Sequence, residues 1–176
     1  MKGYLKYITD TVVLRTAVRK DVSAISEILR NAVQRMLAEG KQQWTESYPT
    51  ATHVRADIEN GNGYVLEKDG EVIGYAAVVF SGEPAYESFD GSWLSNGRYV
   101  VAHRMAVSQG VKGLGYGRIF MEAIEGFARE EGFNSFKVDT NFDNFSMLGL
   151  LAKLGFTYCG EIEYEGGSRK AFEKLI

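Results

Sequence analysis

Three glycines on alternate positions, between an apolar segment and an amphipathic one, constrain this chain more than any other feature. They lie in Lys112–Arg118 (KGLGYGR), directly after the apolar segment Tyr99–Val107. Glycine has no Cβ, so a bulky ligand can come close to the backbone. The first turn of the following helix adds unpaired N–H groups and a partial positive charge, which bind anions. The order strand, glycine-rich turn, helix therefore predicts a phosphate-binding site.

Length, composition and charge indicate the broad class of protein to which this chain belongs. The chain has 176 residues, of which 45% are hydrophobic and only two are proline, so we expect one globular domain over residues 1–176. A net charge of -3 argues against a nucleic-acid partner held by bulk electrostatics. The single cysteine, Cys159, fits a reducing compartment. No signal-peptide pattern and no apolar run of about 20 residues is present, so we expect a cytoplasmic protein with no membrane partner.

Hydrophobic periodicity predicts seven strands and four helices. The strands are expected at 11–17, 63–67, 72–80, 99–107, 136–140, 156–164 and 169–174, and the helices at 22–39, 51–59, 116–131 and 146–154. Asp21 is the expected N-cap of the first helix. Residues 81–97 show no period and form a long loop with three aromatic residues. Hairpins early and βαβ units late indicate an α/β fold with a mixed, mostly antiparallel sheet of about seven strands and helices on both faces.

This element order and two motifs resemble the GNAT family of acetyl-CoA-dependent N-acyltransferases. The family's acyl-CoA motif, Arg/Gln-x-x-Gly-x-Gly/Ala, matches Lys112–Gly117, with lysine in place of arginine or glutamine. A second family segment, an asparagine that heads a helix ending in Gly-Phe, matches Asn144 through Gly155 and Phe156. The resemblance spans about residues 11–174.

The resemblance implies acetyl-CoA as co-substrate, no metal, and a set of binding residues. Backbone N–H groups of the turn would hold the pyrophosphate of coenzyme A, and a strand edge would pair with the pantetheine arm. Asn144 would contact the arm or fix the splay between strands. The residues implied in cofactor binding are Met105, Val107, Lys112, Gly113, Leu114, Gly115, Gly117, Arg118 and Asn144. A tight turn that binds nothing is the alternative; a P-loop is disfavoured because the Gly-Lys-Ser/Thr ending is absent.

His103 is the candidate catalytic base. In a regular strand it shares a face with Met105 and Val107, and in serotonin-type arylalkylamine acetyltransferases a histidine at the matching offset takes part in proton removal. The alternative is a partly buried histidine with a structural hydrogen bond. Many family members protonate the leaving thiolate with a tyrosine, whose place Leu151 takes here. The resemblance therefore leaves the general acid open.

Acceptor recognition in the family comes from the early helices and the loop before the motif strand. Here Trp44, Tyr86 and Trp93 are the candidate acceptor-binding residues. Glu83 and Glu87 are candidates for pairing with a cationic amine, and the alternative for both is plain solvent exposure. The aromatic residues could instead form a lid or a homodimer contact. The expected activity is acetyl transfer from acetyl-CoA to a primary amine of a small molecule or peptide, directly in a ternary complex. The alternative is a non-catalytic acyl-CoA-binding sensor or regulatory module.

Overall fold

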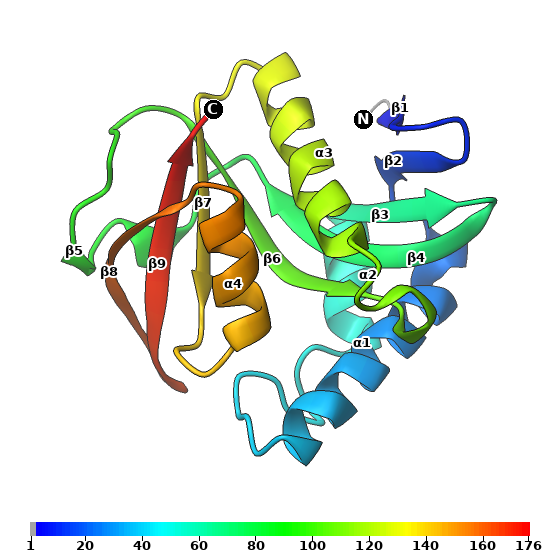
Figure 1. Cartoon of the computed structure of the whole chain (residues 1–176), viewed down its shortest axis with the longest axis horizontal. Helices are drawn as coiled ribbons and strands as arrows, with labels where there is room; N and C mark the ends of the chain where they lie inside the picture. The colour runs from blue at the N-terminus through cyan, green and yellow to red at the C-terminus, as the bar shows by residue number, and fades with distance from the viewer. Residues whose placement is uncertain (1–2) are drawn as a thin grey trace. The chain divides into compact units, whose positions relative to one another are not determined.

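The computed structural model describes residues 3–176, which contain nine strands and four α-helices (Figure 1). The helices are α1 (Val22–Ala38), α2 (Ala51–Glu59), α3 (Tyr116–Glu130) and α4 (Phe145–Lys153), and the short 3-10 turns are η1 (Arg19–Asp21), η2 (Pro84–Tyr86) and η3 (Gln109–Val111). The strands are β1 (Leu5–Tyr7), β2 (Val12–Thr16), β3 (Gly63–Lys68), β4 (Glu71–Val79), β5 (Asp90–Gly91), β6 (Tyr99–Val107), β7 (Ser135–Thr140), β8 (Thr157–Tyr164) and β9 (Gly167–Leu175).

The strands form one mixed sheet in the order β1-β2-β3-β4-β6-β7-β9-β8-β5. Neighbours β6 and β7 run parallel, whereas β1-β2, β2-β3, β3-β4, β7-β9, β9-β8 and β8-β5 are antiparallel. The α/β fold class and the seven expected strands are confirmed. The count of about seven is corrected to nine, because β1 and β5 were not predicted. These strands have three and two residues, too few to show a period.

Two compact units make up the described chain, and each is described by itself. The first holds the described residues up to Val78 together with Arg104–Ile124. Its main core lies between α1, α2 and one face of β3 and β4, where Leu29, Val54 and Tyr75 are buried in one cluster. On β4, Gly74 has the opposite parity to Tyr75. A Cβ on Gly74 would lie 3.1 Å from a ring carbon of Phe120 in α3, so helices pack on both faces.

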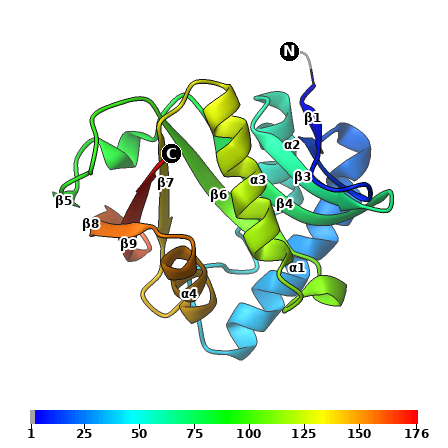
Figure 2. The ribbon, with the colours of Figure 1, turned by 45° about the horizontal axis from the view of Figure 1, so that its top comes forward.

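The second unit holds Val79–His103 and Glu125–Ile176. One face of β7 packs against the chain leaving α4, where the rings of Phe136 and Phe156 meet edge to face at 5.3 Å, and α4 lies beside β7 in both views (Figures 1 and 2). Val101, Ile162 and Ala171 are buried in a cluster that includes Tyr86 of η2. We call residues 80–98, which contain η2 and β5, the covering loop.

Asp21 corrects one detail of the sequence analysis. Its carboxylate does not cap α1. Instead it accepts hydrogen bonds from Arg15 at 2.8 Å and from the N–H of Val18 at 2.8 Å. The partly buried Arg15 on β2 competes successfully for the carboxylate because a charged donor binds it more strongly than a backbone N–H does. In residues 3–176, no helix combines the length and the apolar character that a membrane span requires.

Candidate active site

The glycine-rich turn lies in the first unit, between η3 and α3. Gly113 and Gly115 both have positive φ, +81° and +87°, in the left-handed region where a side chain is strained. No atom lies within 4 Å of the Cβ that either position would carry, so both open toward solvent. The helix begins at Tyr116, directly after the second glycine. The backbone of this turn is therefore accessible from outside, as a ligand-binding turn requires.

Three contacts within the first unit fix the position of the turn. The N–H of Ser108 donates to the carbonyl of Ile73 on β4 at 2.7 Å, directly after β6. Arg35 of α1 donates to the side-chain oxygen of Gln109 at 2.6 Å and so ties η3 to the helix. Phe120, one turn into α3, is fully buried against Gly74. The turn thus lies on a rigid support although it is itself exposed.

The residues implied in binding the pyrophosphate lie together on this turn. The N–H of Leu114 donates to the carbonyl of Val111 at 3.2 Å, which closes the turn. Gly117 and Arg118 lie in the first turn of α3, where backbone N–H groups have no intrahelical acceptor. The Arg118 guanidinium pairs with Glu122 at 2.8 Å, so its expected contribution is the backbone N–H. Gly113, Gly115 and the exposed Lys112 complete the turn.

Met105 and Val107 lie at the end of β6 in the same unit, and their predicted pairing with the pantetheine arm stays a prediction. The strand is not regular before them, because Arg104 has φ +52°. That conformation interrupts the alternation of side chains on which the same-face argument for His103 depended. Strand parity therefore does not place His103 on the same face as Met105 and Val107, and the candidate role of His103 depends on its own contacts.

Asn144 lies in the second unit and caps α4. Its side-chain oxygen accepts the N–H of Met147 at 3.3 Å. The expected position at the head of a helix is confirmed, since α4 begins at Phe145. Its contact with the cofactor stays a prediction.

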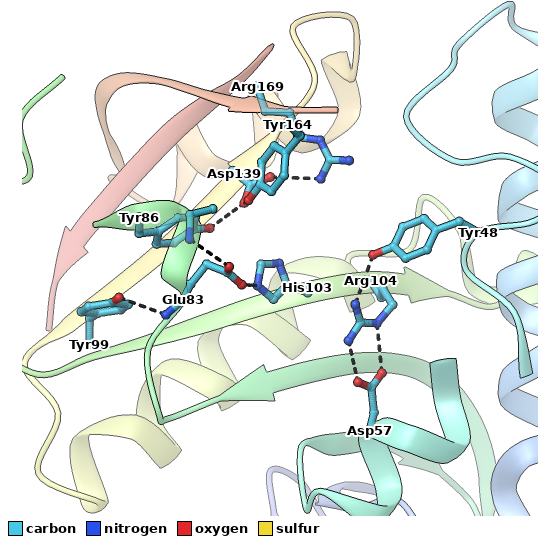
Figure 3. A network of polar contacts seen from close by, with 11 residues as sticks. Tyr48, Asp57, Glu83, Tyr86, Tyr99, His103, Arg104, Asp139, Tyr164 and Arg169 are labelled. Atoms are coloured by element: carbon cyan, nitrogen blue, oxygen red, sulfur yellow. Dashed lines mark hydrogen bonds and ion pairs between the residues drawn. The ribbon is translucent and has the colours of Figure 1, made fainter. Parts of the chain in front are cut away.

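His103 forms a pair with Glu83 of the covering loop (Figure 3). His103 Nε2 and Glu83 Oε2 are 2.9 Å apart, and both side chains are partly buried. The other carboxylate oxygen accepts the N–H of Ala85 at 3.2 Å, and the N–H of Glu83 itself donates to Tyr99 Oη at 3.1 Å. Two contacts thus hold the carboxylate of Glu83, and a third holds its backbone. Glu83, a candidate for pairing with a cationic amine, pairs with this histidine in the structure, and a contact with an amine stays a prediction.

A second polar cluster lies next to this pair in the same unit (Figure 3). The buried carboxylate of Asp139 accepts hydrogen bonds from Tyr86 at 2.7 Å, from Tyr164 at 3.0 Å and from Arg169 at 3.3 Å. The rings of Tyr86 and His103 are 6.4 Å apart. Burial and then the charge of Asp139 raise the pKa of the hydroxyls of Tyr86 and Tyr164. Both tyrosines therefore stay protonated.

Two further charged residues hold the covering loop from beneath. Lys137 Nζ lies 4.2 Å from the ring centre of Trp93 and 3.9 Å from that of Tyr99, and burial lowers the pKa of this lysine. The fully buried Glu173 accepts the N–H of Leu94 at 2.5 Å and the hydroxyls of Ser95 and Ser135 at 2.6 Å each. Asp139, Lys137 and Glu173 were not predicted from the sequence. The one local sign was the presence of two charged residues, Lys137 and Asp139, on alternate positions of a short apolar strand.

The candidate acceptor residues differ in exposure. Trp44 is only 5% exposed and packs in the core of the first unit. Tyr86 is 2% exposed with its hydroxyl on Asp139. Trp93 is half-buried, and its indole N–H donates to the carbonyl of Tyr86 at 2.9 Å. Their roles in acceptor binding stay predictions, as does the role of the exposed Glu87.

The first unit holds a separate arginine network (Figure 3). Arg104 donates to both carboxylate oxygens of Asp57, at 2.5 and 3.0 Å, and to Tyr48 Oη at 3.1 Å. Tyr75 donates to the same Asp57 at 2.5 Å. The two-point pair fixes the guanidinium and supports the strained φ of Arg104. This network was not predicted, because no local pattern marks Asp57 as a partner of a residue 47 positions away.

Leu151 and Cys159 limit the catalytic roles that are available at their two positions. Leu151 is fully buried and cannot donate a proton. Cys159 is a buried free thiol, and burial raises its pKa, so it is a poor nucleophile. In the part of the chain that the structure describes, no group of three or more His, Cys, Asp and Glu side chains could hold a metal ion.

Comparison with known proteins identifies the family. The model of the acetyltransferase (GNAT) family matches residues 28–156. A GNAT acetyltransferase from Streptococcus agalactiae is 30% identical, with a TM-score of 0.87 over 98% of this chain and 99% of that one. Two more distant structures share the fold. Salmonella typhimurium yncA, solved with acetyl-CoA, is 20% identical, with a TM-score of 0.67 over 94% of both chains. A ribosomal-protein-alanine N-acetyltransferase from Brucella melitensis is 22% identical, with a TM-score of 0.67 over 93% of this chain and 99% of that one.

A comparison with the curated proteins finds no match. The family match covers most of the chain and agrees with the strand, turn and helix that form the glycine-rich site. The chain therefore belongs to the GNAT family of acetyltransferases, and it is an acyltransferase enzyme.

Proposed function

We propose that this enzyme transfers an acetyl group from acetyl-CoA to a primary amine, directly in a ternary complex. The observation that carries the proposal is the exposed glycine turn at the start of α3. Gly113 and Gly115 adopt positive φ with open space where a side chain would be, and the helix N-terminus follows at once. These features fit the pyrophosphate of coenzyme A, which needs backbone N–H donors without side chains in the way. The co-substrate supplies the activated acyl group as a thioester.

The acceptor amine has to lose a proton before it attacks. For a lysine-like amine with a pKa of about 10.4, the neutral form at pH 7 costs roughly 4–5 kcal/mol. We assign proton removal to His103. Glu83 is an acceptor only, so it fixes the proton on Nε2 and leaves Nδ1 as the basic nitrogen. Glu83 is thus a positioning residue, and the same charge stabilises the imidazolium that forms.

Departure of the thiolate needs no dedicated acid in this proposal. A thiol with a pKa of about 8.5 leaves tolerably well unprotonated. Tyr86 and Tyr164 are poor substitutes for the missing tyrosine at Leu151, because their raised pKa values and their shared bond to Asp139 hold their protons. The buried Cys159 with its raised pKa supports direct transfer rather than an acyl-cysteine intermediate.

Two measurements on the full chain test the proposal. Calorimetric titration with acetyl-CoA should give a saturable binding heat, and the absence of heat at about 1 mM would reject cofactor binding. Release of free CoA thiol is then followed with a panel of α-amino acids, polyamines, amino sugars and peptides with free N-termini. The Brucella relative acts on a ribosomal-protein alanine, so peptides that begin with alanine belong in the panel. Turnover on one class identifies the acceptor.

Binding of acetyl-CoA without turnover on any amine would favour the other candidate, an acyl-CoA sensor or regulatory module. The buried Leu151 at the place of the usual tyrosine favours that alternative. A cytoplasmic location and independence from metal stay predictions, tested by fractionation and by activity in the presence of a chelator.

A further inference from the structure

A cavity of about 410 Å³ lies in the first unit, between α1 and the segment that leads into α2. None of its lining residues belongs to the glycine turn or to the His103–Glu83 pair. Leu29, Val33 and Pro49 are buried and form an apolar floor. The volume falls within the range of roughly 300–1,000 Å³ in which small-molecule sites are found. A small metabolite with an apolar part fits such a floor.

The exposed side of the cavity carries two opposite charges, Arg30 from α1 and Glu46 from the segment before α2. Within residues 3–176, neither side chain forms a hydrogen bond or an ion pair. The partly buried Arg15 and Arg104 of this unit, in contrast, are paired with Asp21 and Asp57. A guanidinium and a carboxylate that line one cavity without pairing to each other can each bind an opposite charge on a ligand.

Ser26, on the same face of α1, adds a third polar group. Its hydroxyl oxygen is buried and has no hydrogen-bond partner among the described residues. Buried hydroxyls are normally paired, so this one is open to a polar atom of a ligand or to water after a small rotation of the side chain. Gln34, exposed one helical turn beyond Arg30, supplies a neutral donor and acceptor.

We infer that this cavity binds a free α-amino acid with an apolar side chain. The carboxylate would pair with Arg30 in a charge-assisted bond, the ammonium with Glu46, and the side chain would cover Leu29 and Val33. A simple amine lacks the carboxylate that would pair with Arg30, and a fatty acid lacks the ammonium group that would pair with Glu46. The inference concerns ligand binding only and does not rest on the proposed function, because it is tested without acetyl-CoA.

Calorimetric titration of the full chain with L-leucine, L-methionine and L-phenylalanine is the test. We expect saturable binding of at least one of them below about 5 mM. Leucinamide, which lacks the carboxylate, and 4-methylpentanoate, which lacks the amine, should each bind at least about 10-fold more weakly, since each loses one charged pair. Glycine should bind more weakly as well, because it leaves the apolar floor uncovered.

Variants locate the site. Arg30→Gln and Glu46→Gln should each weaken the best amino acid by about 10-fold or more, while Arg55→Gln and Glu27→Gln, both exposed on α2 and α1, should leave it unchanged. Ala51→Phe should block the cavity, with circular dichroism and the melting temperature showing that the fold persists.

Three results would overturn the inference. The first is no binding of any of the three amino acids at 10 mM. The second is equal binding of leucinamide or of 4-methylpentanoate. The third is a Kd that stays the same in Arg30→Gln and in Glu46→Gln. Failure of acetyl transfer in the separate thiol-release assay would leave the inference standing.

Discussion

The glycine turn and the covering loop are held in place by opposite means. Backbone hydrogen bonds, two positive-φ glycines and one helix N-terminus shape the turn, and its side chains face solvent. The covering loop has little regular structure, and side chains anchor it. Three of its residues, Glu83, Tyr86 and Trp93, each form a hydrogen bond with a specific partner. The buried Glu173 accepts two further hydrogen bonds from the loop and one from Ser135 of β7.

The difference predicts two kinds of sensitivity. A site made of backbone tolerates changes of exposed side chains but not the addition of a Cβ where φ is positive. A segment anchored by buried polar side chains tolerates changes of exposed residues. It loses stability when one oxygen of an anchoring side chain is removed, because the buried partner is then left unpaired. The substitutions below test this contrast, from the largest expected effect to the smallest.

Gly115→Trp should have the largest effect. Position 115 has φ +87° and opens toward solvent, so the indole would strain the turn and fill the space proposed for the pyrophosphate. We expect binding of acetyl-CoA to weaken by more than about 100-fold, measured by calorimetry. Gly110→Ala is the matched control, because that glycine also has open space around it but no positive φ. Equal binding by both variants would show that the backbone of the turn does not hold the cofactor.

The turn was predictable from the sequence because its determinants are local. Glycines at fixed spacing and a helix start are visible in seven consecutive residues, and both lie where the pattern put them. Most strands and helices were predictable for the same reason, since a buried face repeats with the period of its element. The short strands β1 and β5 were not predicted, because a segment of two or three residues is too short to show a period.

The anchors of the covering loop were not predictable, because their partners are far away in the chain. Tyr86 binds Asp139 across 53 positions, and Leu94 binds Glu173 across 79. No local pattern distinguishes Glu83, which binds His103, from the exposed Glu87 four residues later. The parity argument for His103 failed at Arg104, where a single positive φ interrupts the strand. At Arg104 this conformation occurs together with a pair to Asp57, which lies 47 positions away in the chain.

His103→Ala should lower kcat/KM by on the order of 10²-fold, the usual contribution of a positioned general base. Binding of acetyl-CoA should stay within about 2-fold of wild type, because the turn does not depend on this side chain. His103→Gln should behave like His103→Ala in turnover although it can still donate to Glu83. Activity within about 3-fold of wild type in both variants would assign proton removal to another group or to water.

Glu83→Gln should lower kcat by about 10-fold, at the lower end of acid–base effects. The amide oxygen can still accept from His103 Nε2 at the observed 2.9 Å, but the negative charge that stabilises the imidazolium is lost. The loss should fall on kcat and leave the Kd of acetyl-CoA within about 2-fold of wild type, a split that a purely structural role would not produce. Glu87→Gln is the matched control on the same loop. An unchanged kcat in Glu83→Gln would separate the carboxylate from catalysis.

Tyr86→Phe tests the anchoring of the covering loop with the smallest expected effect, a loss of stability of about 1–3 kcal/mol from one buried hydrogen bond. Burial and the charge of Asp139 raise the pKa of Tyr86 above its ordinary value of about 10. A group with a raised folded-state pKa contributes stability that is complete below its unfolded pKa and is lost as pH rises toward the folded value. In urea titrations, the difference in free energy of unfolding between wild type and Tyr86→Phe should therefore shrink by about 1 kcal/mol between pH 10 and pH 11.

Tyr7→Phe is the control for this prediction. Its side chain is 66% exposed, so the variant should be indistinguishable from wild type over that range. A gap for Tyr86→Phe that stays constant with pH would mean that this hydroxyl ionises as easily in the folded chain as in the unfolded one, and the covering loop would then be anchored by its apolar contacts rather than by the bond to Asp139.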